Sequence, residues 1–334
     1  MSDKDVAQQH QENAPQKKRG CAAHCKRFWW AYLILAVVVI VLVVVLVLFV
    51  GVPKIAQKKI NEAKLNIDGI IVSETEPNKY RMSVNSSITT DGSVHADIDG
   101  FVGNMYLEDL EPHTPFAALN FPATTSQKFT EVNVSQIVDV ANMDAFTTFN
   151  TWLLANESLK LTIEGDTHVR VKGLSKKYGV TFKKTIELKG LNGFKGLEVT
   201  EPHVDLVALT NNFQALVKVP NASILTIEIG NATFVNKYDG EDIGTVYMDN
   251  LVLYPGINDV PMHADIKQEP VLVAITTKPH CTDGIVPFDL SGKDVKKDGE
   301  TLSYYANALS QLELNVPIKL GDAFAEAGLE VSCD

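Results

Sequence analysis

Motifs of the common catalytic centres are absent from this chain of 334 residues. It contains no G-x-S-x-G nucleophile elbow, no H-E-x-x-H zinc pair and no G-x-x-x-x-G-K-[ST] phosphate loop. Six histidines follow residue 52, and they are scattered singly at His95, His113, His168, His203, His263 and His280. We therefore expect a protein that is not an enzyme, without catalytic residues, a cofactor or a bound metal.

Positive charge is scarce in most of the chain. The whole chain has a formal net charge of -11, although its first 27 residues have a net charge of +3, so the remainder carries -14. An acidic region without basic clusters does not attract nucleic acid or anionic lipid headgroups. We therefore expect no nucleic acid among the partners of this protein.

Charge is lacking altogether between Phe28 and Val52, where the centre of the run is almost wholly valine and leucine. About 20 apolar residues in a helix cross the hydrocarbon core of a bilayer. A secretory signal peptide has a shorter apolar run, followed by small residues at a cleavage site. The sequence predicts an uncleaved transmembrane helix over 28–52, after a disordered cytoplasmic tail over 1–27.

The orientation of the predicted span follows from the residues on its two sides. Five basic residues lie close before it and four close after it, a small excess that favours a cytoplasmic N-terminus. Together with the sequons below, this excess predicts a type II topology with a large lumenal or extracellular part. The N-x-[ST] glycosylation sequons all follow the span, and a chain of this length contains a few unused ones by chance. They begin at Asn85, Asn133, Asn156, Asn221 and Asn231.

The chain has only four cysteines, and the predicted span separates them into two pairs. Cys281 and Cys333 fall in the oxidising compartment, which favours a single disulfide over two buried free thiols. Cys21 and Cys25 lie on the reducing side, beside basic residues and the span. That setting is typical of reversible palmitoylation, with two unmodified thiols as the alternative. The stretch CAAHC offers three soft ligands where a structural zinc site uses four, so we expect no zinc there.

After the span the hydrophobic pattern changes from helical to alternating. Apolar residues at helical spacing predict a stalk helix over 53–69. From Ile70 onward apolar and polar residues alternate many times, as in residues 159–163 and, after a turn predicted at 164–166, from Val169 onward. Such runs predict antiparallel sheets with one buried face, so the part after the stalk is mainly β.

Two short helices interrupt this alternation. Phe146, Phe149 and Leu153 fall on one helical face after the N-cap candidate Asn142, and we interpret them as the inner face of a helix that packs on a sheet. Residues 302–309 repeat the pattern. Each helix is followed at once by an alternating strand, which suggests an internal duplication. With a glycine cluster as the boundary, we predict two tandem β domains over 70–192 and 193–334.

The segment from Val217 to Asn258 contains a strand, an alternating strand, a hairpin and a Pro-Gly turn in succession. It resembles the late-embryogenesis-abundant group 2 domain, also called the water-stress and hypersensitive-response domain. Together with residues 116–173, it more closely resembles a fungal family of single-pass membrane proteins that carry a related domain of unknown function, over most of 70–266. The positions that carry the first likeness are Pro220, Asn221, Tyr238, Gly240, Gly244, Leu253, Pro255 and Gly256.

The resemblance implies an antiparallel sandwich of immunoglobulin-like shape. The predicted fold is therefore mainly β, with two tandem sandwiches, each with a short helix, after one transmembrane helix. The resemblance also implies a compartment, because it includes vacuolar membrane proteins, and we therefore expect the vacuole membrane rather than the plasma membrane.

The predicted function is that of a non-enzymatic glycoprotein that presents its sandwiches to the vacuole lumen or the cell exterior for binding or scaffolding. A lipid or another lumenal protein is the expected partner. The alternative is a lipid-binding or lipid-transfer protein that uses a hydrophobic cavity in one sandwich.

Overall fold

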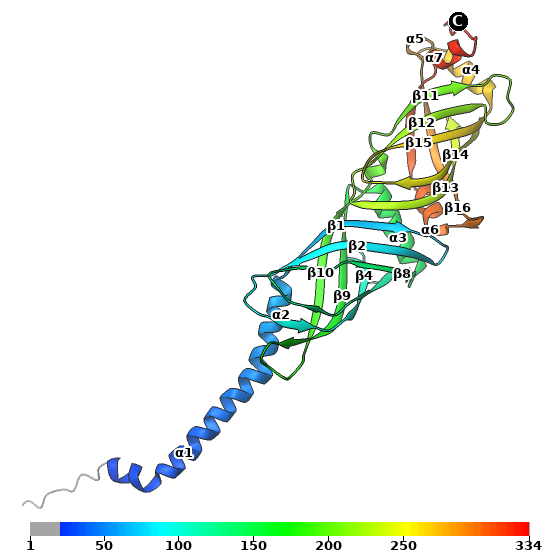
Figure 1. Ribbon diagram of the computed structural model, residues 1–334. Coiled ribbons are helices and arrows are strands. Elements are labelled where there is room, and N and C mark those ends of the chain that lie inside the picture. The colour runs from blue at the N-terminus through cyan, green and yellow to red at the C-terminus, as the bar shows by residue number, and fades with distance from the viewer. Residues whose placement is uncertain (1–20, 334) are drawn as a thin grey trace, which may run out of the picture. The chain divides into compact units, whose positions relative to one another are not determined.

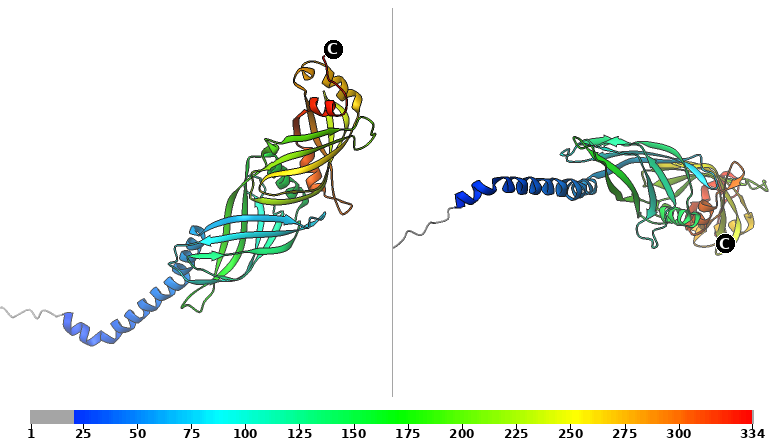
Figure 2. Two further views of the ribbon diagram at one scale, coloured as in Figure 1. Left: turned by 45° about the horizontal axis from the view of Figure 1, so that its top comes forward. Right: turned by 90° about the horizontal axis from the view of Figure 1, so that it is seen from below.

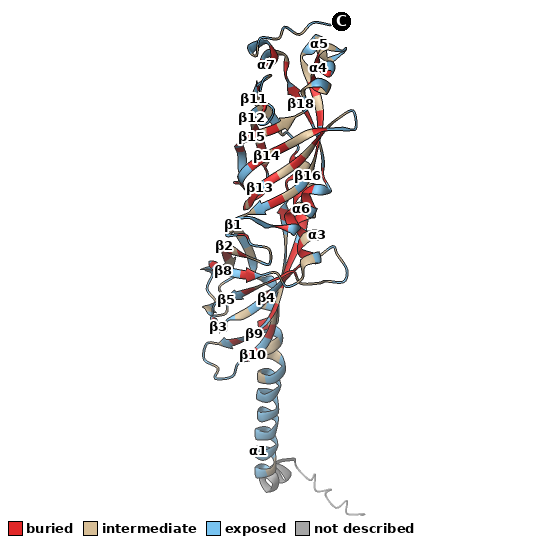
Figure 3. Ribbon diagram, turned by 90° about the vertical axis from the view of Figure 1, so that its right-hand side faces the viewer, coloured by how far each residue is buried: buried red, intermediate tan, exposed pale blue. Residues whose placement is uncertain are grey.

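The computed structural model describes residues 21–333, and the side chains of residues 29–333. The chain forms two compact units, one up to Lys54 and the other from Ile55 to Asp334. The first unit contains helix α1 (Cys21–Leu46) and a π-helical turn, η1 (Val47–Gly51). Its side chains are exposed along almost the whole described length, as Figure 3 shows for α1.

One helical segment, Trp29–Glu62, is long and apolar enough to cross a membrane, with a mean hydropathy of 3.9 over 18 residues. By length and composition it fits a membrane anchor or a signal sequence. Helix α1 begins at Cys21, inside the tail predicted over 1–27, and the rest of that tail lies outside the described residues. The side chains of Cys21 and Cys25 are also outside them, so their palmitoylation stays a prediction.

The stalk helix is shorter than the sequence predicts. Helix α2 (Val52–Glu62) ends there, and strand β1 (Lys64–Ser73) begins two residues later. The prediction of a helix up to residue 69 is therefore wrong from residue 63 onward. Ile67 follows Ala63 at helical spacing and also alternates with Leu65, so the pattern fits both elements, and tertiary pairing of β1 with β2 (Lys79–Thr89) decides for the strand.

The second unit is built from two sheets, neither of which is closed. The larger sheet runs in the order β11-β12-β15-β14-β13-β1-β2-β7, with β8 also paired to β2, and with β16 paired to β13, β17 and β18. Its strands are β1, β2, β7 (Phe129–Glu131), β8 (Val134–Asp139), β11 (Glu198–Val204), β12 (Phe213–Asn221), β13 (Leu225–Tyr238), β14 (Glu241–Leu253), β15 (Gly256–Ile266), β16 (Ile285–Lys297), β17 (Glu300–Thr301) and β18 (Glu313–Lys319).

The smaller sheet runs in the order β5-β4-β9-β3-β6, with β10 paired to β9. Most strand pairs in both sheets are antiparallel, but β1 pairs with β13 in parallel. The strands of the smaller sheet are β3 (Ala96–Ile98), β4 (Phe101–Leu107), β5 (Ala117–Phe121), β6 (Thr124–Thr125), β9 (Ser158–Val171) and β10 (Tyr178–Lys189).

Short helices cover the sheets. Asn142 caps α3, because its Oδ1 accepts a hydrogen bond from the Ala145 backbone N–H at 2.8 Å, as the sequence predicts. Helix α3 packs against α6 (Figure 1). The ring centroids of Phe146 and Tyr304 are 4.8 Å apart. The helices of the second unit after α2 are α3 (Met143–Ala155), the 3₁₀ turn η2 (Asn192–Phe194), α4 (Gln268–Thr276), α5 (His280–Asp283), α6 (Ser303–Ser310) and α7 (Gly321–Glu326).

The sequence predicts a turn at residues 164–166, but these residues lie inside strand β9, so that prediction is wrong. The strand continues through Gly165, which pairs with Phe182 of β10. A Cβ atom on Gly165 would lie 2.1 Å from the carbonyl oxygen of Val102 on β4. This glycine is therefore required by the close approach of a neighbouring strand rather than by a turn.

The mainly β fold with two sheets and short helices confirms the predicted fold class. Strands from both sides of residue 192 share the larger sheet, because β1 pairs with β13 (Figures 1 and 2). One hydrophobic cluster also contains residues from both sides, such as Leu161 and Leu253. The division into domains at residue 192 stays a prediction. One cavity is lined by residues before this position and another by residues after it.

Candidate functional site

Two apolar cavities lie within the second unit, one in each half. The larger one has a volume of about 120 Å³ and is lined by α2 and by strands of both sheets; we call it the α2 cavity. The smaller one has a volume of about 70 Å³ and is lined by strands β11–β16 and β18; we call it the β13 cavity. Each is a concave, mostly apolar space of the kind that binds small molecules.

The α2 cavity lies between the two sheets. Its walls follow from strand alternation, because every second residue of a strand points to the same face. Ile67 of β1 and Val84 of β2 line it from the larger sheet, while Ile163 of β9 lines it from the smaller one. Helix α2 covers it with Ala56 and Ile60.

Helix α2 is held in place by polar contacts to the edge strand β10. The Gln57 amide donates to the Thr181 carbonyl at 2.8 Å and accepts from the Thr181 N–H at 2.9 Å. In this way the Gln57 side chain forms the two backbone hydrogen bonds that a neighbouring strand would form with Thr181. The Lys184 ammonium donates to the Asn61 carbonyl at 2.9 Å and to the Ala63 carbonyl at 2.5 Å, where the helix ends. Burial lowers the pKa of Lys184.

An ion pair between Lys59 and Asp91 lies at the surface end of the α2 cavity. These side chains are 32% and 52% exposed, so this part of the lining reaches solvent. The hydrogen bond from Lys59, followed by those from the Ser93 N–H and hydroxyl, holds the pKa of Asp91 well below its ordinary value. The same hydrogen bond raises the pKa of Lys59. The pair joins α2 to the loop after β2.

The β13 cavity lies among strands of the larger sheet alone. Val217 of β12 and Met248 of β14 line it from one part of the sheet, and Leu290 of β16 lines it from another. Val271 of α4 and Phe324 of α7 close it with helices from the last third of the chain. Its polar lining residues are Asn212, Asn236 and Gln268.

The aromatic face of α3 lines neither of these two cavities. The Phe146 ring stacks on Tyr80 with centroids 5.1 Å apart, and Phe149 stacks on Phe116 at 4.7 Å. Phe146, Phe149 and Leu153 are all buried around a space of only about 20 Å³. They form the packed core, in agreement with their interpretation from the sequence.

The structure places four of the five predicted glycosylation sequons at the surface. Asn85 is on β2, Asn133 follows β7, Asn156 ends α3 and Asn231 is on β13, and all four are exposed. Their use stays a prediction.

Asn221 is a different case, because its predicted use as a glycosylation site is wrong. Its side chain is 3% exposed. Its Nδ2, the atom that would carry a glycan, donates to the carbonyls of Leu225 at 2.8 Å and Leu253 at 3.3 Å, and its Oδ1 accepts from the Ser223 N–H. A glycan at this atom is incompatible with the folded strand ends, because the amide is fully used inside the protein.

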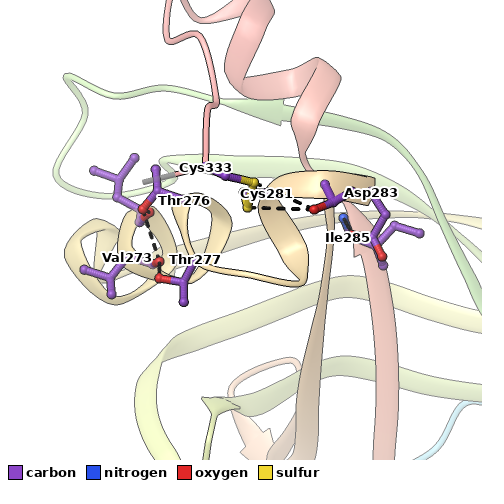
Figure 4. The surroundings of a disulfide bond; sticks show 9 residues. Val273, Thr276, Thr277, Cys281, Asp283, Ile285 and Cys333 are labelled. Atoms are coloured by element: carbon purple, nitrogen blue, oxygen red, sulfur yellow. Dashed lines mark hydrogen bonds between the residues drawn. A yellow bond between two sulfur atoms is a disulfide. The ribbon is translucent and has the colours of Figure 1, made fainter.

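Cys281 and Cys333 are joined by a disulfide across a sequence separation of 52 residues. Figure 4 shows that the bond connects α5 with the segment that follows α7. Nearby, the Thr277 hydroxyl donates to the Val273 carbonyl at 2.7 Å and ends α4. The bond therefore links the segments that directly follow α4 and α7, the two helices that close the β13 cavity.

The absence of a metal centre stays a prediction. Among residues with described side chains, no three or more His, Cys, Asp or Glu residues are placed to hold an ion. His263 stacks on Tyr247 with ring centroids 5.0 Å apart, and its Nε2 lies 3.2 Å from Asp249. Asp97 lies in β3, while Asp99 and Gly100 connect β3 to β4, and Asp99 pairs with Lys177 at 2.5 Å.

Comparison with known proteins identifies a domain but no activity. Residues 114–236 match the model of a family described as a protein of unknown function, DUF3712. This match confirms that the chain contains a domain of unknown function, while the fungal origin and the relation to the late-embryogenesis-abundant domain stay predictions. Among curated proteins none matches this chain.

Solved structures show only remote likeness. The chain aligns with a glycosyl hydrolase family 2 member from Bacteroides cellulosilyticus at 12% identity and TM-score 0.19, over 45% of this chain and 17% of that one. It aligns with the SafA pilin and SafB chaperone complex of Salmonella enterica at 8% identity and TM-score 0.20, over 69% and 89%. It aligns with a bacterial adhesin from Mobiluncus mulieris at 9% identity and TM-score 0.20, over 75% of this chain and 84% of that one. At these TM-scores no conclusion about this chain follows.

Proposed function

We propose that this chain is a membrane-anchored, non-enzymatic binding protein that holds an apolar ligand in the α2 cavity. The observation that carries this proposal is the cavity of about 120 Å³ between the two sheets, with α2 as its cover. The residues that immediately precede α2 form an exposed apolar helix. Connectivity therefore keeps the cavity cover close in sequence to the proposed membrane span.

The volume sets the class of ligand. An engineered apolar cavity of about 150 Å³ stays dry and takes up a benzene-sized molecule. A cavity of similar size accepts a short apolar segment, and the end of an acyl chain has that shape and chemistry. Met82 and Met105 line the cavity, and flexible methionine side chains adapt to ligands of different shapes. The ligand class we propose is therefore a lipid that inserts one chain end.

The proposed compartment is the vacuole lumen or the cell exterior, with the N-terminus in the cytoplasm. The disulfide between Cys281 and Cys333 supports it, because such bonds persist mainly in oxidising compartments. Four exposed sequons after the span support it as well. Mapping of glycans on the protein from its own cells tests the orientation, and a tagged copy that locates away from the vacuole membrane would remove the vacuolar part.

A photoreactive fatty acid tests the binding proposal on the full chain in lipid nanodiscs. After illumination, mass spectrometry identifies the labelled peptides. We expect label in the peptides of β2 and β9, in addition to label on the span, which serves as an internal reference. The substitution Val84→Phe fills the α2 cavity and should remove the label on β2 and β9 while the label on the span remains.

The matched control is the same substitution at Val217, which lines the β13 cavity. Both positions are buried valines on strands of the larger sheet, at 6% and 1% exposure, so both variants carry a similar packing cost. Val217→Phe should leave the label on β2 and β9 unchanged. Label confined to the span in the wild-type protein would contradict ligand binding in the α2 cavity.

A further inference from the structure

The amide of Asn236 is an unusual group in the interior of this protein. Asn236 lies in β13 and is 5% exposed, and its Oδ1 is fully buried without a hydrogen-bond partner. Among residues 29–333, only two other buried side-chain atoms lack a partner, Glu228 Oε2 and His263 Nδ1. Buried polar atoms are nearly always paired, so an exception points to a missing partner.

Asn236 lines the β13 cavity, where the other polar side chains are already bonded. The Asn212 amide donates to the Ile266 carbonyl at 2.7 Å and accepts from the Ile266 N–H at 2.9 Å. The Gln268 amide donates to the Asp205 carbonyl at 3.0 Å. The cavity thus combines a mostly apolar wall with one open acceptor at Asn236.

A water molecule alone fits this arrangement poorly. A buried water is typically held by two to four polar partners, and among the residues that line this cavity Asn236 Oδ1 is the one fully buried side-chain atom without a partner. A molecule with an apolar body and a single hydroxyl group satisfies both features. The apolar body occupies the space between Val217, Met248 and Leu290, and the hydroxyl reaches Asn236.

We propose that the β13 cavity binds a small apolar alcohol, or the hydroxyl-bearing apolar end of a larger molecule, with the hydroxyl donating to Asn236 Oδ1. The proposal rests on a different cavity from the proposed function and does not depend on it.

Methionine methyl groups report on the two cavities separately. Met248 and Met262 line the β13 cavity, and Met82 and Met105 line the α2 cavity, in a chain with six methionines. The full chain, labelled with ¹³C at the methionine methyl groups and held in detergent micelles, is titrated with 1-butanol. A parallel titration uses 1-methoxypropane, an isomer of the same size that accepts but does not donate a hydrogen bond.

We expect the Met248 and Met262 signals to shift with 1-butanol at about 3- to 10-fold lower concentration than with 1-methoxypropane, the preference that one hydrogen bond supplies. In Asn236→Leu, a variant of similar volume, the two isomers should shift these signals at equal concentrations. Equal shifts by the two isomers in the wild-type protein would overturn the proposal. So would no shift at Met248 and Met262 with either isomer, which indicates an occupied or inaccessible space. Because the wild-type comparison decides by itself, the test stands even if the variant folds poorly.

Discussion

The two cavities differ in how they are closed and in where their polar groups lie. The α2 cavity is covered by a helix whose contacts bridge more than a hundred residues, as in the pair Gln57 and Thr181, and its charged lining residues are at the surface. The β13 cavity is closed by helical segments near the C-terminus that a disulfide joins, and its open polar atom, Asn236 Oδ1, is buried. Noncovalent contacts hold the helix that covers the first cavity, whereas a covalent bond joins the chain segments next to the helices that close the second.

The largest expected effect comes from removal of the disulfide. Replacement of Cys281 and Cys333 by serine should lower the free energy of unfolding by about 2–4 kcal/mol, because the bond closes a loop of some 50 residues in the unfolded chain. Chemical denaturation of the full chain measures this loss.

The same variant sharpens the comparison between the cavities. Access of 1-butanol to Met248 and Met262 should become faster, while Met82 and Met105 should respond as in the wild-type protein. An equal change at all four methionines would show that the bond stabilises the whole second unit rather than the closure of the β13 cavity.

The next effect is that of filling each cavity. Val84→Phe and Val217→Phe should each cost about 1–3 kcal/mol of stability through overpacking. Each should perturb the methionine signals of its own cavity, and each serves as the control for the other. Signals that respond in both cavities to either substitution would mean that the cavities are coupled.

Asn236→Leu should have a smaller effect, and of opposite sign. In the absence of ligand it removes an unpaired buried acceptor, so we expect the free energy of unfolding to rise by about 1 kcal/mol. The matched control is Asn212→Leu in the same cavity, where two hydrogen bonds are lost and stability should fall by about 1–3 kcal/mol. Destabilisation by both variants would indicate that Asn236 already has a partner.

The smallest effect concerns pH and the docking of α2. Lys59 holds the folded-state pKa of Asp91 below its ordinary value of about 3.9. The stabilisation that Asp91 contributes is therefore fully present above about pH 3.9 and is lost as the pH falls below that value. Acidification from about pH 7 to about pH 5 should therefore leave α2 docked. Amide hydrogen exchange at Thr181 and in α2 measures this docking.

Asp91→Asn is the control for the pH prediction. It should show faster exchange in α2 at every pH and a weaker change between about pH 5 and about pH 3. If the wild-type protein loses protection of α2 already near pH 6, a group other than Asp91 governs the docking.

Local chemistry explains which elements could be predicted. Asn142 before an apolar helical face is sufficient for a capped helix, and α3 begins where that pattern places it. Two cysteines on one side of the span leave a single possible pairing, and Cys281 and Cys333 form it. In contrast, Gly165 reads as a turn residue by composition, although it is there because β4 passes close to it.

The candidate cavities themselves could not be predicted from the order of residues. Val84 and Val217 have the same alternating surroundings as many core valines, and nothing local indicates that space remains beside them. The burial of Asn221 could not be predicted either. A sequon is a local pattern, whereas the contacts that bury this side chain come from Leu225 and Leu253.

The amino-acid sequence by itself determined the apolar helix, the alternation that makes the protein mainly β, and the helix cap at Asn142, because each depends on residues a few positions apart. Only the tertiary structure decided that β1 joins β13, that α2 covers a cavity, and that Asn236 is buried without a partner. These features depend on packing between segments distant in sequence, where small differences in shape leave a space open or fill it.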